Sequence, residues 1–232
     1  GRARARPGAA ARPTSRVETG NSETSLLSYL DALEGAFDDY VRRRPEAAAI
    51  DGYFQRLVYH LPFAGMGLVA HRTLLRRLGR AARAAANDHF ARMCGASLAY
   101  SRRMGGTYGA STFLGLMSML DHDDALRAGD RVGIYAYGSG SCAELWSARV
   151  GPEAREVVRA AGLRELLDRR RIFTVDEYEA VERARCAAID AGDHATDRTL
   201  LSGHFASYYG RAPHLVFDGT ADHYRRYSWS VA

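Results

Sequence analysis

Residues 54–72 read FQRLVYHLPFAGMGLVAHR, and a change of hydrophobic period inside this stretch decides the fold. Its first part predicts a short strand from a run of apolar residues, Phe54, Leu57, Val58 and Tyr59, which ends at His60. Pro62 follows and favours a turn there. From residue 63 onward the apolar positions recur every four residues, which predicts a helix with one apolar face: Met66, Ala70, Leu74 and Leu78.

His60, between the predicted strand and helix, is the candidate catalytic residue. Histidine titrates near neutral pH and is the most frequent general base, and two rigid elements would hold its ring in place. A lone histidine beside apolar residues is more often a hydrogen-bonded core residue. The local pattern alone therefore leaves both interpretations open.

Other segments predict further helices. An apolar stripe at residues 26, 30, 33, 37 and 41 predicts a helix that stops near Pro45. A second helix is expected from about residue 82 to 103, with Phe90, Met93 and Ser97 on its inner face, ended by the glycine pair at 105 and 106. Residues 108–120 are almost free of charge and predict a buried helix with the inner stripe Ala110, Leu114, Met117 and Leu120.

The second half of the chain predicts a hairpin and a mixed tail. RVGIYAY and CAELWSARV alternate with a period of two, and the Gly-Ser-Gly turn at 138–140 separates them. A short helix is expected from Pro152, and Thr174 with Glu177 forms a capping-box signature before a longer one. The tail from Leu200 is predicted as strands and loops. Mixed elements of this kind indicate a layered α/β domain.

Composition limits the class of protein. With 232 residues, 47% of them hydrophobic and 25% charged, the chain fits one ordinary globular domain, expected at residues 21–232 after a flexible arginine-rich linker at 1–20. No apolar run reaches the roughly 20 residues of a membrane span. The net charge of +5 suits an acidic partner, although a solvated surface explains it equally well, and nucleic acid is disfavoured because no concentrated basic face is seen.

Cysteine and histidine spacing gives no metal motif. The cysteines at 94, 142 and 186 are odd in number and lack CxxC spacing, so reduced thiols in the cytoplasm are expected. The eight histidines are scattered without paired ligand spacing, which predicts no metal site.

Three blocks resemble the 3-hydroxy-3-methylglutaryl-CoA (HMG-CoA) synthase family. They are YHLPFAGMGLVAHRTLLRRL at 59–78, GGTYGASTFLGLMSML at 105–120 and GDRVGIYAYGSG at 129–140. The similarity runs from about residue 12 to Trp229 and covers only the second half of the family pattern. The resemblance implies a thiolase-like fold of layered αβαβα architecture, of which this chain would be the second half.

The resemblance also implies roles for individual residues. His60 matches the family histidine that contacts and polarises the β-keto substrate, and Phe63 lies in the same motif. Ser139 and the adjacent Gly138 match the loop that lines the thioester site, although Gly-Ser-Gly alone is also an ordinary hairpin turn. Gly106 stands where the family carries an asparagine that donates to the substrate carbonyl.

The resemblance places the nucleophilic cysteine and the acid of the reaction in the first half of the family pattern, and Cys142 does not occupy the nucleophile's position. The implied reaction is an aldol-type addition of an acetyl thioester to a β-keto thioester. Because Gly65 and Val69 replace the lysines of the CoA-dependent branch, we expect a β-branching enzyme of polyketide assembly that acts on acyl carrier proteins.

The expected partners are acyl carrier proteins and an N-terminal-half polypeptide with Cys and Glu, in a dimer. No tightly bound cofactor is expected, since phosphopantetheine on the carrier protein, or CoA, is part of the substrate. Two alternatives stay open: a non-catalytic half-domain that binds a carrier protein or partner subunit, and an enzyme acting on acetoacetyl-CoA.

Overall fold

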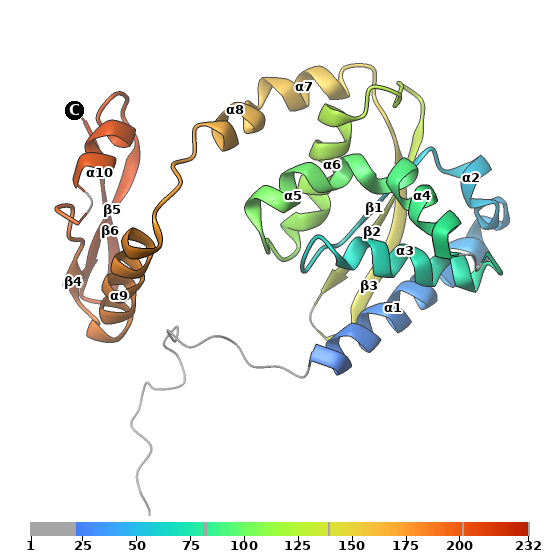
Figure 1. The fold of residues 1–232 in the computed structure, drawn as a ribbon, viewed down its shortest axis with the longest axis horizontal. Helices are drawn as coiled ribbons and strands as arrows, with labels where there is room; N and C mark the ends of the chain where they lie inside the picture. Colours follow the sequence, from blue (N-terminus) through green and yellow to red (C-terminus); the bar gives the residue numbers. More distant parts are fainter. Residues whose placement is uncertain (1–21, 81–82, 139, 201, 232) are drawn as a thin grey trace, which may run out of the picture. The chain divides into compact units, whose positions relative to one another are not determined.

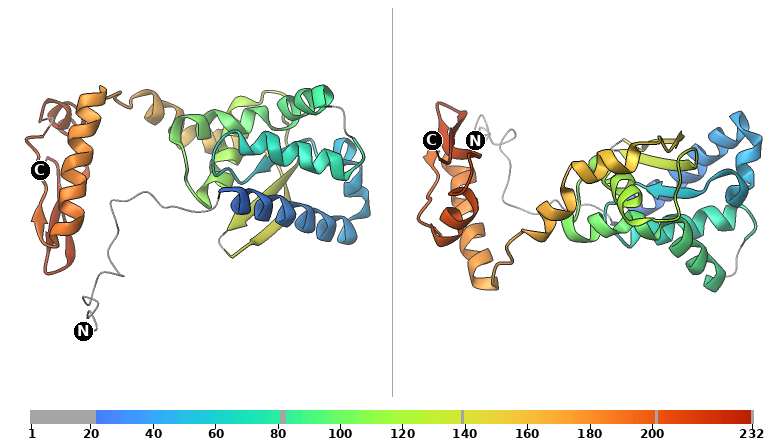
Figure 2. Two further views of the ribbon diagram at one scale, coloured as in Figure 1. Left: turned by 60° about the horizontal axis from the view of Figure 1, so that its bottom comes forward. Right: turned by 90° about the horizontal axis from the view of Figure 1, so that it is seen from above.

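The computed structural model describes residues 22–80, 83–138, 140–200 and 202–231. They divide into two compact units (Figures 1 and 2): a main unit that ends at Arg170 and a C-terminal unit that begins at Arg171. The predicted linker at residues 1–20 lies outside the described residues. A single domain over residues 21–232 stays a prediction.

The main unit consists of helices around a three-stranded sheet (Figure 1). Its strands are β1 (Arg56–Tyr59), β2 (Arg131–Gly138) and β3 (Cys142–Arg149). Its α-helices are α1 (Ser22–Arg43), α2 (Ile50–Tyr53), α3 (Met66–Arg77), α4 (Arg83–Cys94), α5 (Leu98–Met104), α6 (Ala110–His122), α7 (Ala154–Ala160) and α8 (Leu163–Asp168). The described residues of this unit also form the short 3-10 helices η1 (Pro45–Ala48) and η2 (Gly95–Ser97).

The sheet separates two layers of core. β1 pairs in parallel with β2, with Tyr59 opposite Tyr135, and β2 pairs antiparallel with β3 in the predicted hairpin. Alternate side chains of a strand point to opposite faces. Leu57 and Tyr59 accordingly join the core formed with α1, α3 and α4, whereas Val58 joins a second cluster with Met119 and other residues of α6 and β2. The predicted α/β layering is confirmed.

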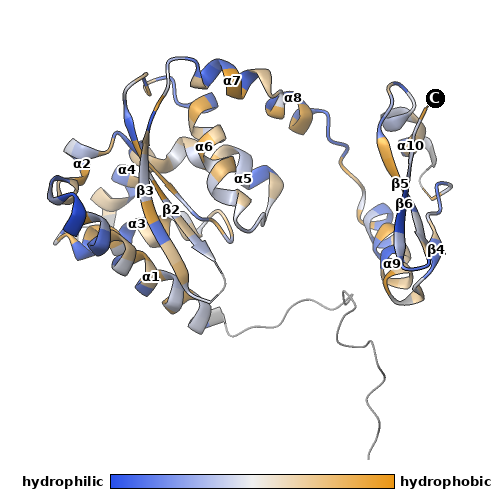
Figure 3. Ribbon diagram, turned by 180° about the vertical axis from the view of Figure 1, so that it is seen from behind, coloured by the Kyte–Doolittle hydropathy of each residue, from blue (hydrophilic) through white to orange (hydrophobic). Residues whose placement is uncertain are grey.

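Helix α6 packs closely on β1 through a glycine. A Cβ atom placed on Gly115 would lie only 2.7 Å from Cγ1 of Val58. The buried face of α6 carries small and polar residues as well as apolar ones: Ser111, Thr112, Gly115, Ser118, Met119, Leu120 and Asp121. The predicted inner stripe was therefore wrong in its rotation, since Ala110 is exposed and Leu114 and Met117 are only partly buried. Figure 3 shows the largely hydrophobic colouring of α6.

The single helix predicted from about residue 82 to 103 is interrupted. Helix α4 ends at Cys94, η2 follows, and α5 resumes at Leu98. Glycine at position 95 disfavours continuation of the helix. Two serine hydroxyls then bind the carbonyl groups at the break, Ser97 Oγ to Cys94 O at 2.7 Å and Ser118 Oγ to Ala96 O at 2.6 Å. The break thereby ties α4 and α5 to α6.

The C-terminal unit contains α9 (Val175–Ala191), β4 (His194–Ala195), α10 (Ser202–Tyr209), β5 (Leu215–Ala221) and β6 (Tyr224–Trp229). The predicted capping box is confirmed, because Thr174 Oγ1 accepts from Glu177 N and Thr174 N donates to the Glu177 carboxylate. The tail prediction was wrong at residues 202–209, which form α10 instead of a strand or loop. Among the described residues of this unit, Val216 is the only buried hydrophobic residue.

Candidate active site

His60 directly follows β1 and its backbone is held on both sides. Its N–H donates to Tyr135 O at 2.8 Å, which extends the β1–β2 pairing by one residue. Its carbonyl accepts from the Tyr29 hydroxyl at 2.8 Å, and the Tyr135 hydroxyl donates to Tyr29 O at 3.1 Å. Only 7% of the His60 surface is exposed. The strand end and α1 therefore fix the position from which the imidazole projects.

The imidazole of His60 is oriented by Ser111 on the first turn of α6. Ser111 Oγ accepts from Leu61 N at 3.0 Å and lies 3.1 Å from His60 Nδ1. With Leu61 N–H on one lone pair, Ser111 Oγ keeps one hydrogen and one lone pair, so it can donate to Nδ1 or accept from it. When the hydroxyl donates, the ring hydrogen of neutral His60 lies on Nε2. Among the described residues, no hydrogen-bond partner competes for Nε2.

The surroundings of His60 favour a neutral ring. The rings of Tyr29 and Tyr137 lie with their centroids 6.3 Å and 6.1 Å from the imidazole centroid. Burial lowers the pKa of His60 below its ordinary value of 6.5. A neutral imidazole with Nε2–H outward can donate a hydrogen bond to a carbonyl oxygen.

Two of the predicted substrate-binding residues lie on segments next to His60. Phe63 is on the loop between β1 and α3 and is 61% exposed. Gly106 is on the segment between α5 and α6, where a Cβ atom would lie 3.5 Å from Pro62 O. Gly105 before it has a φ of 78°, a conformation that favours glycine. The loops after β1 and before α6 thus meet beside His60.

The predicted thioester loop is described only in part. Gly138 is the last residue of β2 and is exposed, directly after Tyr137, whose ring faces His60. Ser139 lies outside the described residues. The roles of His60, Phe63, Gly106, Gly138 and Ser139 stay predictions.

Ser111, Tyr29 and Tyr137 were missed at the level of sequence. Ser111 carried a usable signal, since a serine on the first turn of an otherwise apolar helix needs a hydrogen-bond partner. Tyr29 carried none, because it lies 31 positions before His60 and only the fold brings them together.

Large apolar side chains are exposed on the loops and helices next to the site. Tyr108, just before α6, is 77% exposed, and Phe63, Phe113 and Met104 are exposed too. Exposed apolar surface of this kind often marks a contact with another polypeptide. Residues 108–120 were predicted as a buried helix, yet Tyr108 and Phe113 within them are exposed.

A metal centre beside His60 would require a group of His, Cys, Asp or Glu residues. Within the described ranges no group of three or more His, Cys, Asp or Glu residues could hold a metal ion. The free thiols are Cys94, which is buried, and Cys142 and Cys186, which are not. In the part of the chain that the structure describes, no helix is long and apolar enough to cross a membrane.

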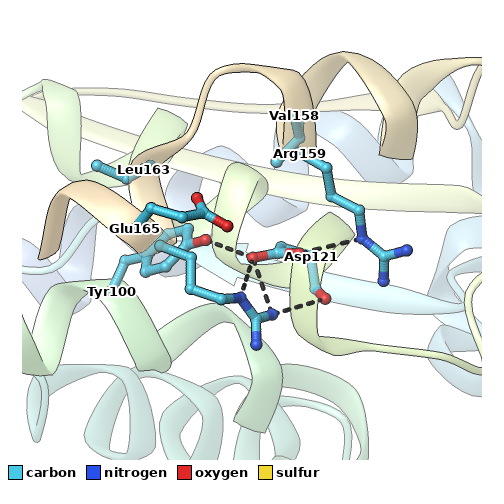
Figure 4. A pocket seen from close by; sticks show the side chains of 7 residues that line it. Tyr100, Asp121, Val158, Arg159, Leu163 and Glu165 are labelled. Atoms are coloured by element: carbon cyan, nitrogen blue, oxygen red, sulfur yellow. Dashed lines mark hydrogen bonds and ion pairs between the residues drawn. The ribbon is translucent and has the colours of Figure 1, made fainter. Parts of the chain in front are cut away.

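A cavity of about 290 Å³ lies at the other end of α6 and is built around an ion-pair network (Figure 4). Burial raises the pKa of Asp121, but hydrogen bonds from Tyr100 and Arg164 and the nearby Arg159 outweigh it and keep the pKa below its usual value. Two guanidinium groups face two carboxylates here, since Glu165 also lines the cavity. With its charges balanced internally, the network joins α7 and α8 to α5 and α6.

Comparisons with known proteins fit this geometry. Residues 67–209 match the family described as "Hydroxymethylglutaryl-coenzyme A synthase C terminal". The chain is 33% identical over 219 residues to "Polyketide biosynthesis 3-hydroxy-3-methylglutaryl-ACP synthase PksG" of Bacillus subtilis (strain 168), a match that covers 94% of this chain and 51% of that protein.

Solved structures give the same result. The curacin biosynthetic pathway HMG synthase matches with a TM-score of 0.84 and 33% identity, over 94% of this chain and 54% of that chain. The same synthase in complex with holo donor-ACP matches with a TM-score of 0.81 and 32% identity, over 92% and 52% of the two chains. The predicted fold class, the second half of a thiolase-like α/β architecture, is confirmed.

The chain spans about half the length of the relatives it matches. The family-model match begins one residue into α3, just after His60 and its loop, and includes the segment before α6, α6 itself and the β2–β3 hairpin. This chain therefore belongs to the hydroxymethylglutaryl-CoA synthase family and corresponds to its C-terminal half.

Proposed function

We propose that this chain supplies His60 to an HMG-synthase-type enzyme that adds an acetyl thioester to a β-ketoacyl group on an acyl carrier protein. The observation that carries the proposal is the orientation of His60. Ser111 binds Nδ1 at 3.1 Å, and Nε2 has no partner among the described residues. A buried, neutral imidazole in this orientation can donate to the β-keto carbonyl while that oxygen becomes negative.

In this mechanism the acetyl group is a thioester of a cysteine on an N-terminal-half polypeptide. An acid–base residue of that polypeptide removes a proton from the acetyl methyl group, and the resulting carbanion attacks the β-keto carbon. His60 Nε2–H donates a hydrogen bond to the carbonyl oxygen and stabilises the negative charge of the alkoxide, which takes up the proton held by the acid–base residue. Positioned donors to a developing oxyanion contribute about 10²–10³-fold to a rate. Water then releases the product from the cysteine.

Two comparisons support a carrier protein as the substrate carrier. One relative is named as an HMG-ACP synthase, and one matching synthase was solved with holo donor-ACP. The positions of Gly65 and Val69, where the CoA-dependent branch carries lysines in the resemblance, favour the same choice. Glycine and valine carry no charge, so neither Gly65, which is exposed, nor Val69, which is partly buried, supplies a cation for a nucleotide phosphate.

The N-terminal-half polypeptide is also the proposed cover of the exposed apolar side chains beside the site, Phe63, Tyr108 and Phe113. Such a cover would exclude water from His60 and bring the cysteine to it. We further propose that the assembled enzyme is a dimer.

Intact-protein mass spectrometry tests the proposed function. This chain is incubated with acetyl- and β-ketoacyl-carrier proteins, with and without an N-terminal-half polypeptide of a relative. The expected result is a carrier protein with the mass of the condensed product only when both polypeptides are present. Carrier-protein binding without any product would contradict catalysis and support the alternative below.

The alternative is a non-catalytic half-domain that binds a carrier protein or partner subunit, and Gly106 is the observation that favours it. One lost donor at an oxyanion costs on the order of 10²–10³ in rate. Gly106 has no positive φ, and its Cβ position lies 3.5 Å from Pro62 O, so a Cβ atom fits there in ordinary contact and without backbone strain. Under the catalytic proposal Gly106→Asn should raise product formation by up to about 10²-fold. No change in a reconstituted mixture would favour the alternative.

A further inference from the structure

A chain of side-chain hydrogen bonds, buried at one end and partly exposed at the other, links four elements of the main unit. His89 Nε2 lies 2.5 Å from Asp51 Oδ1, and His89 Nδ1 lies 2.6 Å from His71 Nε2. His71 Nδ1 lies 2.9 Å from the Tyr59 hydroxyl. These residues come from α2, α4, α3 and β1, and together they form the histidine chain: Asp51, His89, His71 and Tyr59.

With both imidazoles neutral, the hydrogen atoms of the histidine chain have one consistent direction. The carboxylate of Asp51 can only accept, so His89 donates from Nε2, and Nδ1 of the neutral ring accepts. His71 then donates from Nε2 and accepts at Nδ1, and the Tyr59 hydroxyl donates to that nitrogen. Every donor and acceptor in the chain is satisfied, which is the condition under which a buried polar network stabilises a fold.

The polar groups near His71 are the other members of the histidine chain, one thiol and two arginines. His71 has no exposed surface, and His89 is 8% exposed. Cys94 Sγ on α4 lies 3.8 Å from His71 Nδ1, and burial raises the pKa of this thiol, so it stays neutral. At the outer end, Arg80 and Arg92 bind Asp51 at 2.6 Å and 2.9 Å.

We propose that the histidine chain is an acid-sensitive latch, which holds α2, α3 and α4 on β1 at neutral pH and loosens when a proton enters it. This inference does not depend on the proposed function. The latch nevertheless adjoins the candidate site, because Tyr59 precedes His60 and α3 follows the loop of Phe63.

The geometry explains why one proton disrupts the latch. At 2.6 Å only one hydrogen fits between the two imidazoles. A proton added to His89 makes its Nδ1 a donor, so His71 must accept at Nε2 and carry its own hydrogen on Nδ1. That hydrogen faces the Tyr59 hydroxyl, whose own hydrogen then has no other side-chain acceptor among the described residues. A buried donor is left unpaired, which destabilises the folded state.

The electrostatics act in the same direction. Burial, and next the neighbouring His89, lower the pKa of His71 from 6.5 to about 3. The unfolded chain therefore takes up a proton at His71 as the pH falls below 6.5, whereas the folded chain does not until about pH 3. Burial raises the pKa of Asp51, but Arg92, Arg80 and His89 outweigh it and lower the pKa, which adds to the loss of stability in acid.

The test is urea unfolding of the 232-residue chain between pH 7 and pH 5, with His71→Phe and with His204→Gln as control. His204 is paired with Glu177 at 2.7 Å in the C-terminal unit, outside the latch. From pH 7 to 5 the unfolding constant of the main unit should rise about 25-fold through His71, given its unfolded pKa of 6.5. His204→Gln should keep this rise, and His71→Phe should remove it.

Nitrogen-detected NMR of the wild-type chain at pH 7 tests the latch even if His71→Phe fails to fold. His71 should be neutral with its hydrogen on Nε2, and His89 should donate from Nε2 to Asp51. A cationic His71, the opposite tautomer in either ring, or an unchanged pH dependence in a folded His71→Phe variant would overturn the proposal.

Discussion

A methyl group added to α6 at Gly115 should lower the stability of the fold, and this substitution tests how the packing of α6 on β1 supports the site. The added Cβ of Gly115→Ala would lie 2.7 Å from Val58 Cγ1, about 1 Å inside the normal carbon–carbon contact. On its other side are Ser97 O at 3.7 Å and Ser97 Cβ at 3.8 Å, so α6 has little room to shift. Overpacking of this kind costs about 1–3 kcal/mol.

The matched control is Gly35→Ala on α1, where nothing lies within 4 Å of the added Cβ. Both glycines are in helix interiors, so alanine contributes about 1 kcal/mol of helix propensity at each. Gly35→Ala should stabilise the chain by up to about 1 kcal/mol, and Gly115→Ala should be about 1–3 kcal/mol less stable than that control.

Urea denaturation of the two variants and the wild type measures these differences. The reasoning would be refuted if Gly115→Ala were as stable as Gly35→Ala. A second readout follows from the position of Val58 two residues before His60. Displacement of α6 should move Ser111 away from the imidazole, so the pKa and tautomer signals of His60 should change in Gly115→Ala and stay unchanged in Gly35→Ala.

Three further substitutions test the packing around the site and in the C-terminal unit. Arg56→Gln should cost about 3 kcal/mol of unfolding free energy, because it leaves Asp123, whose side chain is only 11% exposed, without its cation; a loss below about 1 kcal/mol would contradict the burial of the pair. Tyr29→Phe removes the donor to the His60 carbonyl and should cost about 1–3 kcal/mol, measured by the same unfolding assay; wild-type stability would show that this hydrogen bond is dispensable. Thr174→Ala should lower the unfolding free energy of the C-terminal unit, followed by its helical circular-dichroism signal, by about 1 kcal/mol; an unchanged melting curve would count against the capping box.

The sequence predicted the elements next to His60 well, because their patterns are local. The change from an apolar run to a four-residue repeat located β1 and α3, and the period of two located the β2–β3 hairpin. The capping box at Thr174 was also visible, since it depends on two residues three positions apart.

The rotation of α6 was not predictable from hydrophobicity. Its buried face contains Ser111, Gly115 and Ser118, because small residues permit close contact with β1 and hydroxyls bind neighbouring backbone groups. A search for the apolar stripe therefore selected a different face, whose Ala110 is exposed. Helix α10 was missed because its short aromatic sequence resembles a strand.

The polar contacts of the site and of the latch depend on long-range packing. Ser111 meets His60 across 51 positions, and the histidine chain combines residues at positions 51, 59, 71 and 89. The histidines looked scattered because no two of them share a local ligand spacing. Only the packing of α3 on α4 and β1 brings these rings into hydrogen-bonding distance.

The most direct test of the central claim is a single-turnover measurement of the condensation step in the assembly with an N-terminal-half polypeptide. The polypeptide's cysteine is first loaded with acetyl, and the β-ketoacyl carrier protein is then added to wild-type, His60→Ala or His122→Gln chains. His122 is a control because it is exposed and lies at the far end of α6. The account predicts equal acetyl loading in all three, with condensation reduced at least about 100-fold only in His60→Ala. Condensation at the wild-type rate in His60→Ala would contradict it.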